Sequence, residues 1–243
     1  MKKNYLSVVL LALVCLAMLL SSDKSIKVMK NIFNQSTINA DSNQIVIVID
    51  PGHGGRDPGK VGVNNLLEKD INLSVAFKLK KLLEQNDIKV IMTREEDILL
   101  ASDTDSNKKR ADMNNRVHII RDNKADLAIS IHQNSYPEEY VKGSQVFYHA
   151  KSDQGKRLAD MIQEQIREAV KDDNHRQAKS NDSYFLLKYT ECPLVIVECG
   201  FLTNNSEAML LKDDTYQEKM AWGIHLGIMQ YINEVGKDTF LRN

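Results

Sequence analysis

The chain has 243 residues, of which 42% are hydrophobic and 27% are charged, and its formal net charge is -1. This length is sufficient for one well-packed domain with a short extension. The balanced charge excludes the strongly basic surface that nucleic-acid binding usually requires. The three cysteines lie far apart and lack the paired spacing of a thiolate zinc site, so we expect Cys192 and Cys199 to be small buried side chains without a disulfide.

The amino terminus differs in composition from the rest of the chain. Lys2 and Lys3 precede an apolar run that ends near Leu20, a pattern more typical of an export-signal core than of a full membrane span. No Ala-x-Ala cleavage site follows, so this segment is expected to be either a cleaved signal or the sole membrane anchor. The prediction therefore divides the chain into a signal or anchor at 1–20, a polar tether at 21–43, an extracytoplasmic domain at 44–235 and a C-terminal tail at 236–243.

The predicted domain begins with a strand and a glycine-rich loop. Residues 45–49 are β-branched without interruption, which predicts a strand buried on both faces. The sequence Asp50-Pro51-Gly52 ends this strand, because proline removes a backbone donor and glycine allows dihedral angles closed to other residues. His53 is therefore expected just beyond the carboxyl end of the strand, where sites form in open α/β sheets. The loop then brings Glu68 to the start of a helix.

Each feature of this loop also has a simpler explanation. A turn histidine satisfied by local hydrogen bonds would explain His53 alone, and a favourable interaction with the helix dipole would explain Glu68. The glycines could be mistaken for a phosphate cradle. However, GHGGRDPGKVG has neither the dinucleotide-binding spacing nor a Walker lysine followed by Ser or Thr, so we exclude a nucleotide site.

The remaining segments alternate between helical and strand patterns. Apolar residues recur at helical spacing at about 68–85, 110–122, 154–171 and 215–235, and apolar or alternating runs predict strands at about 88–93, 126–132, 143–149, 184–187 and 193–199. Polar stretches at 95–109 and 173–181 are expected to be surface loops. Helical crossovers between strands favour parallel pairing. We therefore predict an α/β fold, a single domain with a central mainly parallel sheet flanked by helices on both faces.

Two further ionisable residues stand at predicted strand ends. His132 ends the strand that begins near Asp126, so it reaches the same sheet edge as His53 if the two strands are parallel. Glu198 ends an apolar strand, where an ionisable group requires a partner or a function. The alternative explanation for Glu198 is an ion pair with a buried arginine such as Arg94 or Arg116.

These four residues form a chemically coherent set. Two imidazoles and one carboxylate are a usual ligand set for catalytic Zn²⁺, which keeps its fourth position open for water. The zinc ion lowers the pKa of that water towards about 7 and polarises a bound carbonyl. With His53, Glu68 and His132 as metal ligands, Glu198 could take the proton of the water and pass it to a leaving amine. The residues thus predict a zinc hydrolase that cleaves an amide or ester, without identifying its substrate.

Five segments in this order resemble a known family: IVIDPGHGGRDPG, LLEKDINL, MTR, ADLAISIHQN and PLVIVECGFLTN. They are similar to the zinc-dependent N-acetylmuramoyl-L-alanine amidases of bacterial cell-wall turnover. The resemblance implies hydrolysis of the amide between the lactyl group of N-acetylmuramic acid and the L-alanine that begins the stem peptide. It also implies metal binding by His53, Glu68 and His132, catalysis by Glu198, and substrate binding by Asn134.

The resemblance leaves two positions unusual. Lys60 and Gln133 replace the small residue and the alanine that are commoner in the family, and neither is expected to touch the metal ligands. Arg94 and Arg116 match family positions, where structural pairing near the site is expected.

The arrangement of the chain resembles the sporulation-type amidases of endospore-forming bacteria, with an export segment and no wall-binding repeats. This resemblance implies stem-peptide removal during spore-cortex maturation, before muramic-δ-lactam formation, in the forespore intermembrane space. Peptidoglycan is the expected partner, and an accessory or activating protein is compatible with the pattern. Two alternatives remain open at this stage, a zinc peptidase acting within the stem peptide and a non-catalytic peptidoglycan-binding domain.

Overall fold

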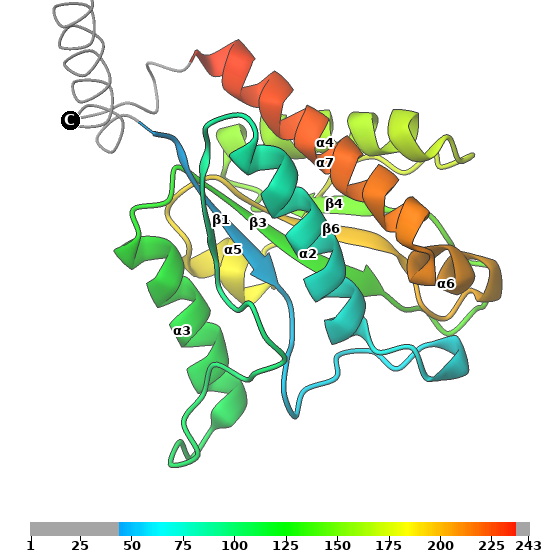
Figure 1. The fold of residues 1–243 in the computed structure, drawn as a ribbon, viewed down its shortest axis with the longest axis horizontal. Coiled ribbons are helices and arrows are strands. Elements are labelled where there is room, and N and C mark those ends of the chain that lie inside the picture. Colours follow the sequence, from blue (N-terminus) through cyan, green and yellow to red (C-terminus); the bar gives the residue numbers. More distant parts are fainter. Residues whose placement is uncertain (1–43, 237–243) are drawn as a thin grey trace, which may run out of the picture. The chain divides into compact units, whose positions relative to one another are not determined.

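A six-stranded sheet forms the centre of the computed structural model, which describes residues 44–236 (Figure 1). The strands are β1 Val46–Pro51, β2 Lys89–Met92, β3 Leu127–Asn134, β4 Gln145–Tyr148, β5 Lys179–Ser180 and β6 Leu194–Phe201. Their order across the sheet is β2-β1-β3-β6-β4-β5. The pairs β2-β1, β1-β3 and β3-β6 are parallel, whereas β4 is antiparallel to β6 and parallel to β5. The predicted mainly parallel sheet is confirmed.

Helices cover both faces of the sheet. The helices are α2 Glu68–Glu84, α3 Lys108–Asp122, α4 Asp153–Val170, α5 Phe185–Tyr189, α6 Asn205–Lys212 and α7 Asp214–Val235, with a short 3-10 turn η1 at Val63–Asn65. Apolar residues of α2, α4 and α7 form one core with the sheet, and those of α3 and α5 form the other. Along β1 the two cores alternate, since Ile47 and Ile49 belong to the first and Val48 to the second. The predicted α/β class is therefore confirmed.

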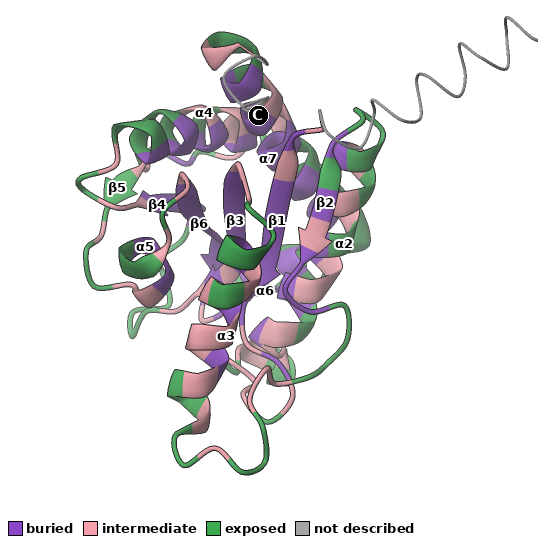
Figure 2. Ribbon diagram, turned by 90° about the vertical axis from the view of Figure 1, so that its left-hand side faces the viewer, coloured by how far each residue is buried: buried purple, intermediate pink, exposed green. Residues whose placement is uncertain are grey.

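Burial of the central strands follows from their composition. β1, β3 and β6 are purple almost throughout in Figure 2, and every residue of β6 is buried. Because both faces of these strands are covered, apolar side chains are favoured at successive positions, which explains the continuous apolar runs in the sequence. The polar exceptions gather at the carboxyl ends of these strands.

Three local predictions differ from the structure. The predicted strand at 184–187 is wrong, because Phe185–Tyr189 forms the short helix α5, whose Leu186 and Leu187 are buried beside α3. An apolar run of four residues cannot distinguish a strand from a buried helical turn. The predicted loop at 173–181 ends in the edge strand β5, and helix α6 was not predicted.

The sequence does contain a signal for α6. The side chain of Asn204 accepts a hydrogen bond from the backbone N–H of Glu207, which is the pairing of a helix N-cap with its third residue.

Cys192 and Cys199 are both free, as expected.

Several predictions concern residues outside the described range. The signal or anchor at 1–20, the tether at 21–43 and the tail from 237 onward are in this group. Between residues 44 and 236, no helix combines the length and apolar character that a membrane span requires.

Candidate metal centre and active site

His53 lies two residues after the end of β1, at the carboxyl edge of the sheet. Its backbone adopts φ 62°, an uncommon left-handed conformation for a residue with a side chain. Its Nδ1 lies 2.8 Å from Oδ2 of Asp57. A carboxylate that holds one ring nitrogen directs the other towards a shared centre, an arrangement common for metal-binding histidines. Here Nε2 points to Glu68, with 3.2 Å between Nε2 and Oε1.

Glu68 begins α2 and is the buried centre of this cluster. Its Oε1 also lies 2.9 Å from Nδ1 of His132, so both imidazoles face the same oxygen. Burial opposes ionisation of Glu68, but hydrogen bonds from His132 and His53 lower the pKa of the carboxyl well below its usual value. Burial likewise opposes protonation of His53, yet Glu68 and Asp57 raise the pKa of its ring to about 9.

The three side chains could hold one metal ion. One ligand atom from each of His53, Glu68 and His132 can be chosen so that all lie within 4.8 Å of one another. Ligand atoms about 2.0–2.2 Å from a tetrahedral zinc ion lie about 3.3 Å from one another. Oε1 of Glu68 lies at similar distances from the two ring nitrogens, 3.2 Å from Nε2 of His53 and 2.9 Å from Nδ1 of His132. The donor set therefore fits zinc in both chemistry and spacing.

Two glycines allow the loop to approach these ligands. A Cβ atom on Gly52 would lie 2.1 Å from Cε1 of the His132 ring. At Gly59, where φ is 68°, it would lie 2.5 Å from Oε2 of Glu68. Any side chain at either position would displace a proposed ligand, so the glycines serve close approach to the site as well as turn formation.

Glu198 approaches the same centre from a different strand. It is the register partner of His132 on the neighbouring strand β6, and the charges of His132, Glu68 and His53 all act on it. Its Oε2 is buried without a hydrogen-bond partner among the described residues. Burial is the main cause that raises the pKa of Glu198 to about 7, with Glu68 adding to the effect and the two histidines opposing it.

The two buried arginines do not pair with Glu198. Arg116 forms ion pairs with Asp50 at 2.6 Å and Asp112 at 2.8 Å, and it donates to the carbonyl oxygen of His53. The side chain of Arg94 donates to backbone carbonyls, including those of Pro51 and Gly52. Both arginines thus stabilise the loop that carries His53, as the structural role predicts, and the ion-pair explanation for Glu198 is wrong.

The expectation for Lys60 and Gln133 needs correction. Their backbone N–H groups donate to the Glu68 carboxylate, at 2.7 Å from Lys60 to Oε2 and 3.1 Å from Gln133 to Oε1. The sequence could not reveal these contacts because backbone groups make them and any residue except proline could supply them. The Gln133 side chain instead donates to Oδ1 of the buried Asn72.

Asn134 ends β3, two residues after His132. Its side-chain oxygen accepts a hydrogen bond from the backbone N–H of Ser135 at 2.8 Å, and the residue is half-buried. Substrate binding by Asn134 stays a prediction.

Two polar residues of the centre were not identified from the sequence. Asp57 holds His53, and Asn72 donates to the carbonyl oxygen of Gly52 at 3.1 Å. Asn72 is one helical turn after Glu68 on α2, so the i, i+4 spacing was an available signal. Asp57 follows His53 at the same spacing, but within a loop, where the spacing does not predict that the two side chains lie on the same side.

Comparisons with known proteins agree with this geometry. Residues 47–230 match the family model described as N-acetylmuramoyl-L-alanine amidase. This chain belongs to the N-acetylmuramoyl-L-alanine amidase family. The predicted family and enzyme class are therefore confirmed, and the α/β fold with them.

Individual relatives cover most of the amidase domain. The chain is 40% identical over 194 residues to the germination-specific N-acetylmuramoyl-L-alanine amidase of Bacillus subtilis, covering 79% of this chain and 81% of that protein. The LytC amidase of the same organism is 32% identical, but this chain covers only 35% of its length. Among solved structures, the CwlD amidase of Clostridioides difficile, in complex with the GerS lipoprotein, has a TM-score of 0.76 and 39% identity, with 79% of this chain and all of that chain covered.

Proposed function

We propose that this amidase is zinc-dependent and hydrolyses the amide bond between N-acetylmuramic acid and L-alanine in peptidoglycan. The observation that carries the proposal is the convergence of His53, Glu68 and His132 at one sheet edge, with Glu198 paired to His132 on the next strand. A zinc ion held by the three ligands would supply Lewis-acid chemistry, lowering the pKa of a water ligand and polarising the substrate carbonyl.

The protein residues divide the remaining tasks. Asp57 fixes the orientation of the His53 ring, and the backbone amides of Lys60 and Gln133 hold the Glu68 carboxylate in place. This preorganisation means that the ligands need little rearrangement when a cation binds. Arg116 stabilises the same loop by donating a hydrogen bond to the carbonyl oxygen of His53.

Glu198 is proposed to move the proton. It accepts the proton of the attacking water as the new bond from oxygen to the lactyl carbonyl carbon forms. It then donates that proton to the nitrogen of L-alanine as the amide C–N bond breaks, and with transfer of the second proton of the water from the new carboxyl group to the amine the products are a lactyl carboxylate and a stem-peptide ammonium group. A carboxyl whose pKa lies at about 7 is suited to both steps near neutral pH.

We also propose that the amidase acts in spore-cortex maturation, where stem-peptide removal prepares muramic acid for δ-lactam formation. The germination-specific relative from Bacillus subtilis supports this placement. The apolar amino-terminal segment supports export, with the forespore intermembrane space as the proposed site of action. An accessory protein is proposed because the similar CwlD amidase was solved in complex with a lipoprotein.

Mass spectrometry of digested peptidoglycan tests the proposed reaction. Purified peptidoglycan would be incubated with the full chain in detergent, with zinc or with a chelator, and with a candidate lipoprotein added to a parallel sample. We expect zinc-dependent release of intact stem peptides that begin with L-alanine, leaving peptide-free muramic acid. Cleavage within the stem would identify a peptidase instead. Absence of release in all samples would contradict the proposal.

A further inference from the structure

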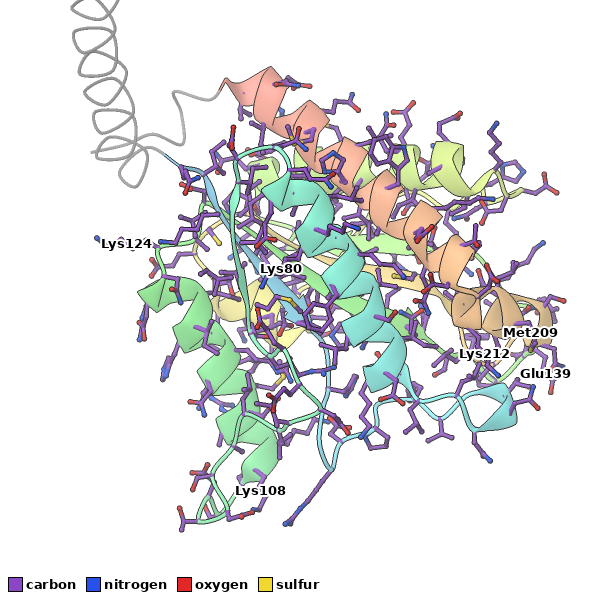
Figure 3. All side chains as sticks on the ribbon, viewed as in Figure 1. Lys80, Lys108, Lys124, Glu139, Met209 and Lys212 are labelled. Carbon is purple, nitrogen blue, oxygen red and sulfur yellow. The ribbon has the colours of Figure 1, made fainter. Side chains whose placement is uncertain are left out.

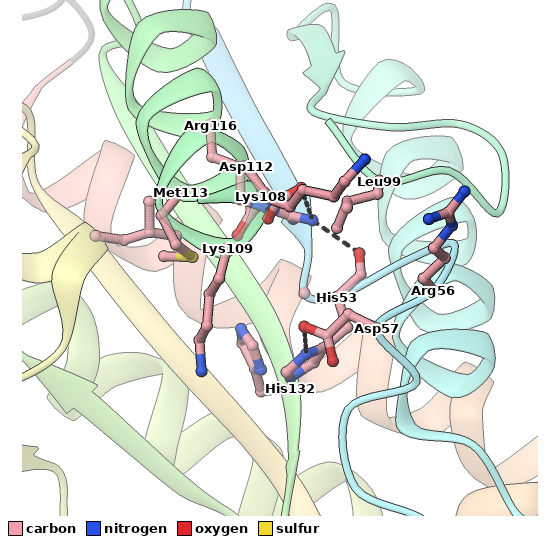
Figure 4. Close-up of a pocket in the computed structure, with 13 residues that line it drawn as sticks. His53, Arg56, Asp57, Leu99, Lys108, Lys109, Asp112, Met113, Arg116 and His132 are labelled. Carbon is pink, nitrogen blue, oxygen red and sulfur yellow. Dashed lines mark hydrogen bonds and ion pairs between the residues drawn. The ribbon is translucent and has the colours of Figure 1, made fainter. Parts of the chain in front are cut away.

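A pocket of about 300 Å³ adjoins the proposed metal centre (Figure 4). It is bounded by His53 and His132 on one side and by the first turns of α3 on the other. Leu99, Met113 and Leu186 contribute an apolar wall. A substrate whose scissile bond lies at the metal centre would place its neighbouring groups in this pocket.

Most positive charges around the pocket are already paired. Arg116 is held by two buried aspartates. Arg56 and Lys108 both face Asp103, at 3.5 Å and 3.0 Å. Figure 3 shows Lys108 at the lower end of α3, far from Lys124 just beyond its other end. These three cations are therefore unsuited to serve as free ligands for a substrate anion.

Lys109 differs from its neighbours. It lines the pocket, and its amine forms no hydrogen bond or ion pair with any residue between 44 and 236. Figure 4 shows its side chain extending from α3 towards the part of the pocket that His132 lines. Its charge acts on Asp57 at longer range, but no described carboxylate lies within ion-pair distance of the amine. A charged amine of this kind, beside a proposed active site, is available to an anionic group of the substrate.

The substrate carries an anion at a matching position. In peptidoglycan the L-alanine is followed by D-glutamate linked through its γ-carboxyl, so the α-carboxylate of that residue is free. Backbone geometry places this carboxylate about 6 Å from the scissile nitrogen in an extended stem. A pocket of about 300 Å³ beside the metal centre has room for this span.

We propose that Lys109 is a specificity-determining residue that binds the α-carboxylate of D-glutamate, the second residue of the stem peptide. This inference rests on the proposed amidase function. It predicts that the enzyme distinguishes stems with D-glutamate from stems in which this carboxylate is amidated to D-isoglutamine, and that Lys109 is the cause of the difference.

Binding and hydrolysis would be measured with two glycan fragments that differ only in D-glutamate or D-isoglutamine. Calorimetric binding uses the zinc-loaded full chain with Glu198→Gln, and kinetics uses active Glu198. We expect Lys109→Gln to weaken binding of the D-glutamate fragment about fivefold to tenfold and to raise its KM similarly, with kcat nearly constant. The D-isoglutamine fragment should show no change. Added salt at about 0.5 M should reduce the preference.

Two further variants make the comparison specific. Lys109→Arg should keep the preference for the D-glutamate fragment because it keeps the charge. Lys81→Gln removes an exposed lysine of α2 that does not line the pocket. This control substitution should leave the binding and hydrolysis of both fragments unchanged. Equal effects of Lys109→Gln on both fragments, or no effect, would overturn the inference. Failure of the unmodified chain to hydrolyse either fragment, with or without the candidate lipoprotein, would instead contradict the proposed function, since the binding comparison is independent of turnover.

Discussion

The two sides of the centre place carboxylates in opposite environments. On the β1–α2 side, Glu68 accepts hydrogen bonds from two backbone amides. Burial opposes its ionisation, but His132 and His53 lower its pKa. On the β6 side, Glu198 lies within a fully buried strand, with one oxygen unpartnered among the described residues, and burial raises its pKa to about 7. The first environment keeps a permanent negative charge for a cation. The second allows proton exchange near neutral pH.

This contrast explains why the site needs two kinds of support. The loop that carries His53 is stabilised by a dense polar network with Arg116 at its centre. The β6 side depends on apolar burial, which supplies desolvation without fixing a hydrogen-bond partner. Each of the following substitutions changes one side, so its effects on metal binding and on proton transfer can be separated.

The largest expected effect is on catalysis at Glu198. Glu198→Gln keeps the shape of the side chain but removes its ability to exchange a proton, so we expect kcat to fall about a thousandfold or more. Zinc content, measured by atomic absorption, should stay at the level of the unmodified chain. By contrast, His132→Ala should lose both zinc and activity. Near-normal turnover of Glu198→Gln would reject the proposed division of roles.

Removing Arg116 should destabilise the β1 side. Arg116→Met leaves Asp50, which is fully buried, without its charge partner, and the free energy of unfolding should fall by about 3–5 kcal/mol. Urea denaturation followed by circular dichroism measures the change. The matched control is Arg121→Met, because this arginine lies on the same helix with its side chain 58% exposed. That substitution should change stability by about 0–1 kcal/mol.

A smaller effect is expected at Asp57. Asp57→Asn removes the carboxylate that orients His53, so zinc affinity should fall about tenfold to a hundredfold. Competition with a chromogenic chelator measures this affinity. The same titration on the unmodified chain should show weaker zinc binding as pH falls below about 9, because His53 must lose its proton to bind a metal. Unchanged affinity in the variant would show that Asp57 does not position this ligand.

The smallest expected effect concerns stability without metal. The folded state keeps the Glu198 proton up to about pH 7, whereas the carboxyl ordinarily loses it near 4.5. This group therefore lowers the free energy of unfolding as pH rises from about 4.5 to 7. In chelator-treated protein at pH 8, Glu198→Gln should be more stable by about 1–3 kcal/mol. Thermal unfolding at pH 4.5 and pH 8 tests this, since the two proteins should differ only at the higher pH.

Most of the fold could be predicted because its strongest signals are local. Continuous apolar runs identify the buried parallel strands, and helical spacing identifies α2, α3, α4 and α7. The failures occur where signals are short. The four residues at 184–187 carried too little periodicity to separate strand from helix, and β5 contains only two residues. Parallel pairing then predicted that His53 and His132 would reach one sheet edge.

By itself, the sequence determined that His53 follows a strand, that His132 and Glu198 lie in the carboxyl-terminal halves of two others, and that Glu68 starts a helix, because backbone patterning decides these positions. The prediction that His132 and Glu198 end their strands is wrong, since these strands continue to Asn134 and Phe201. Only the tertiary structure decided their environments. The pairing of Asp57 with His53 and the amides of Lys60 and Gln133 on Glu68 depend on how folding brings the chain together. The position of Lys109 beside the pocket depends on it as well. Burial and charge at each atom depend on these neighbours, and they separate the carboxylate that stays ionised from the one that can exchange a proton.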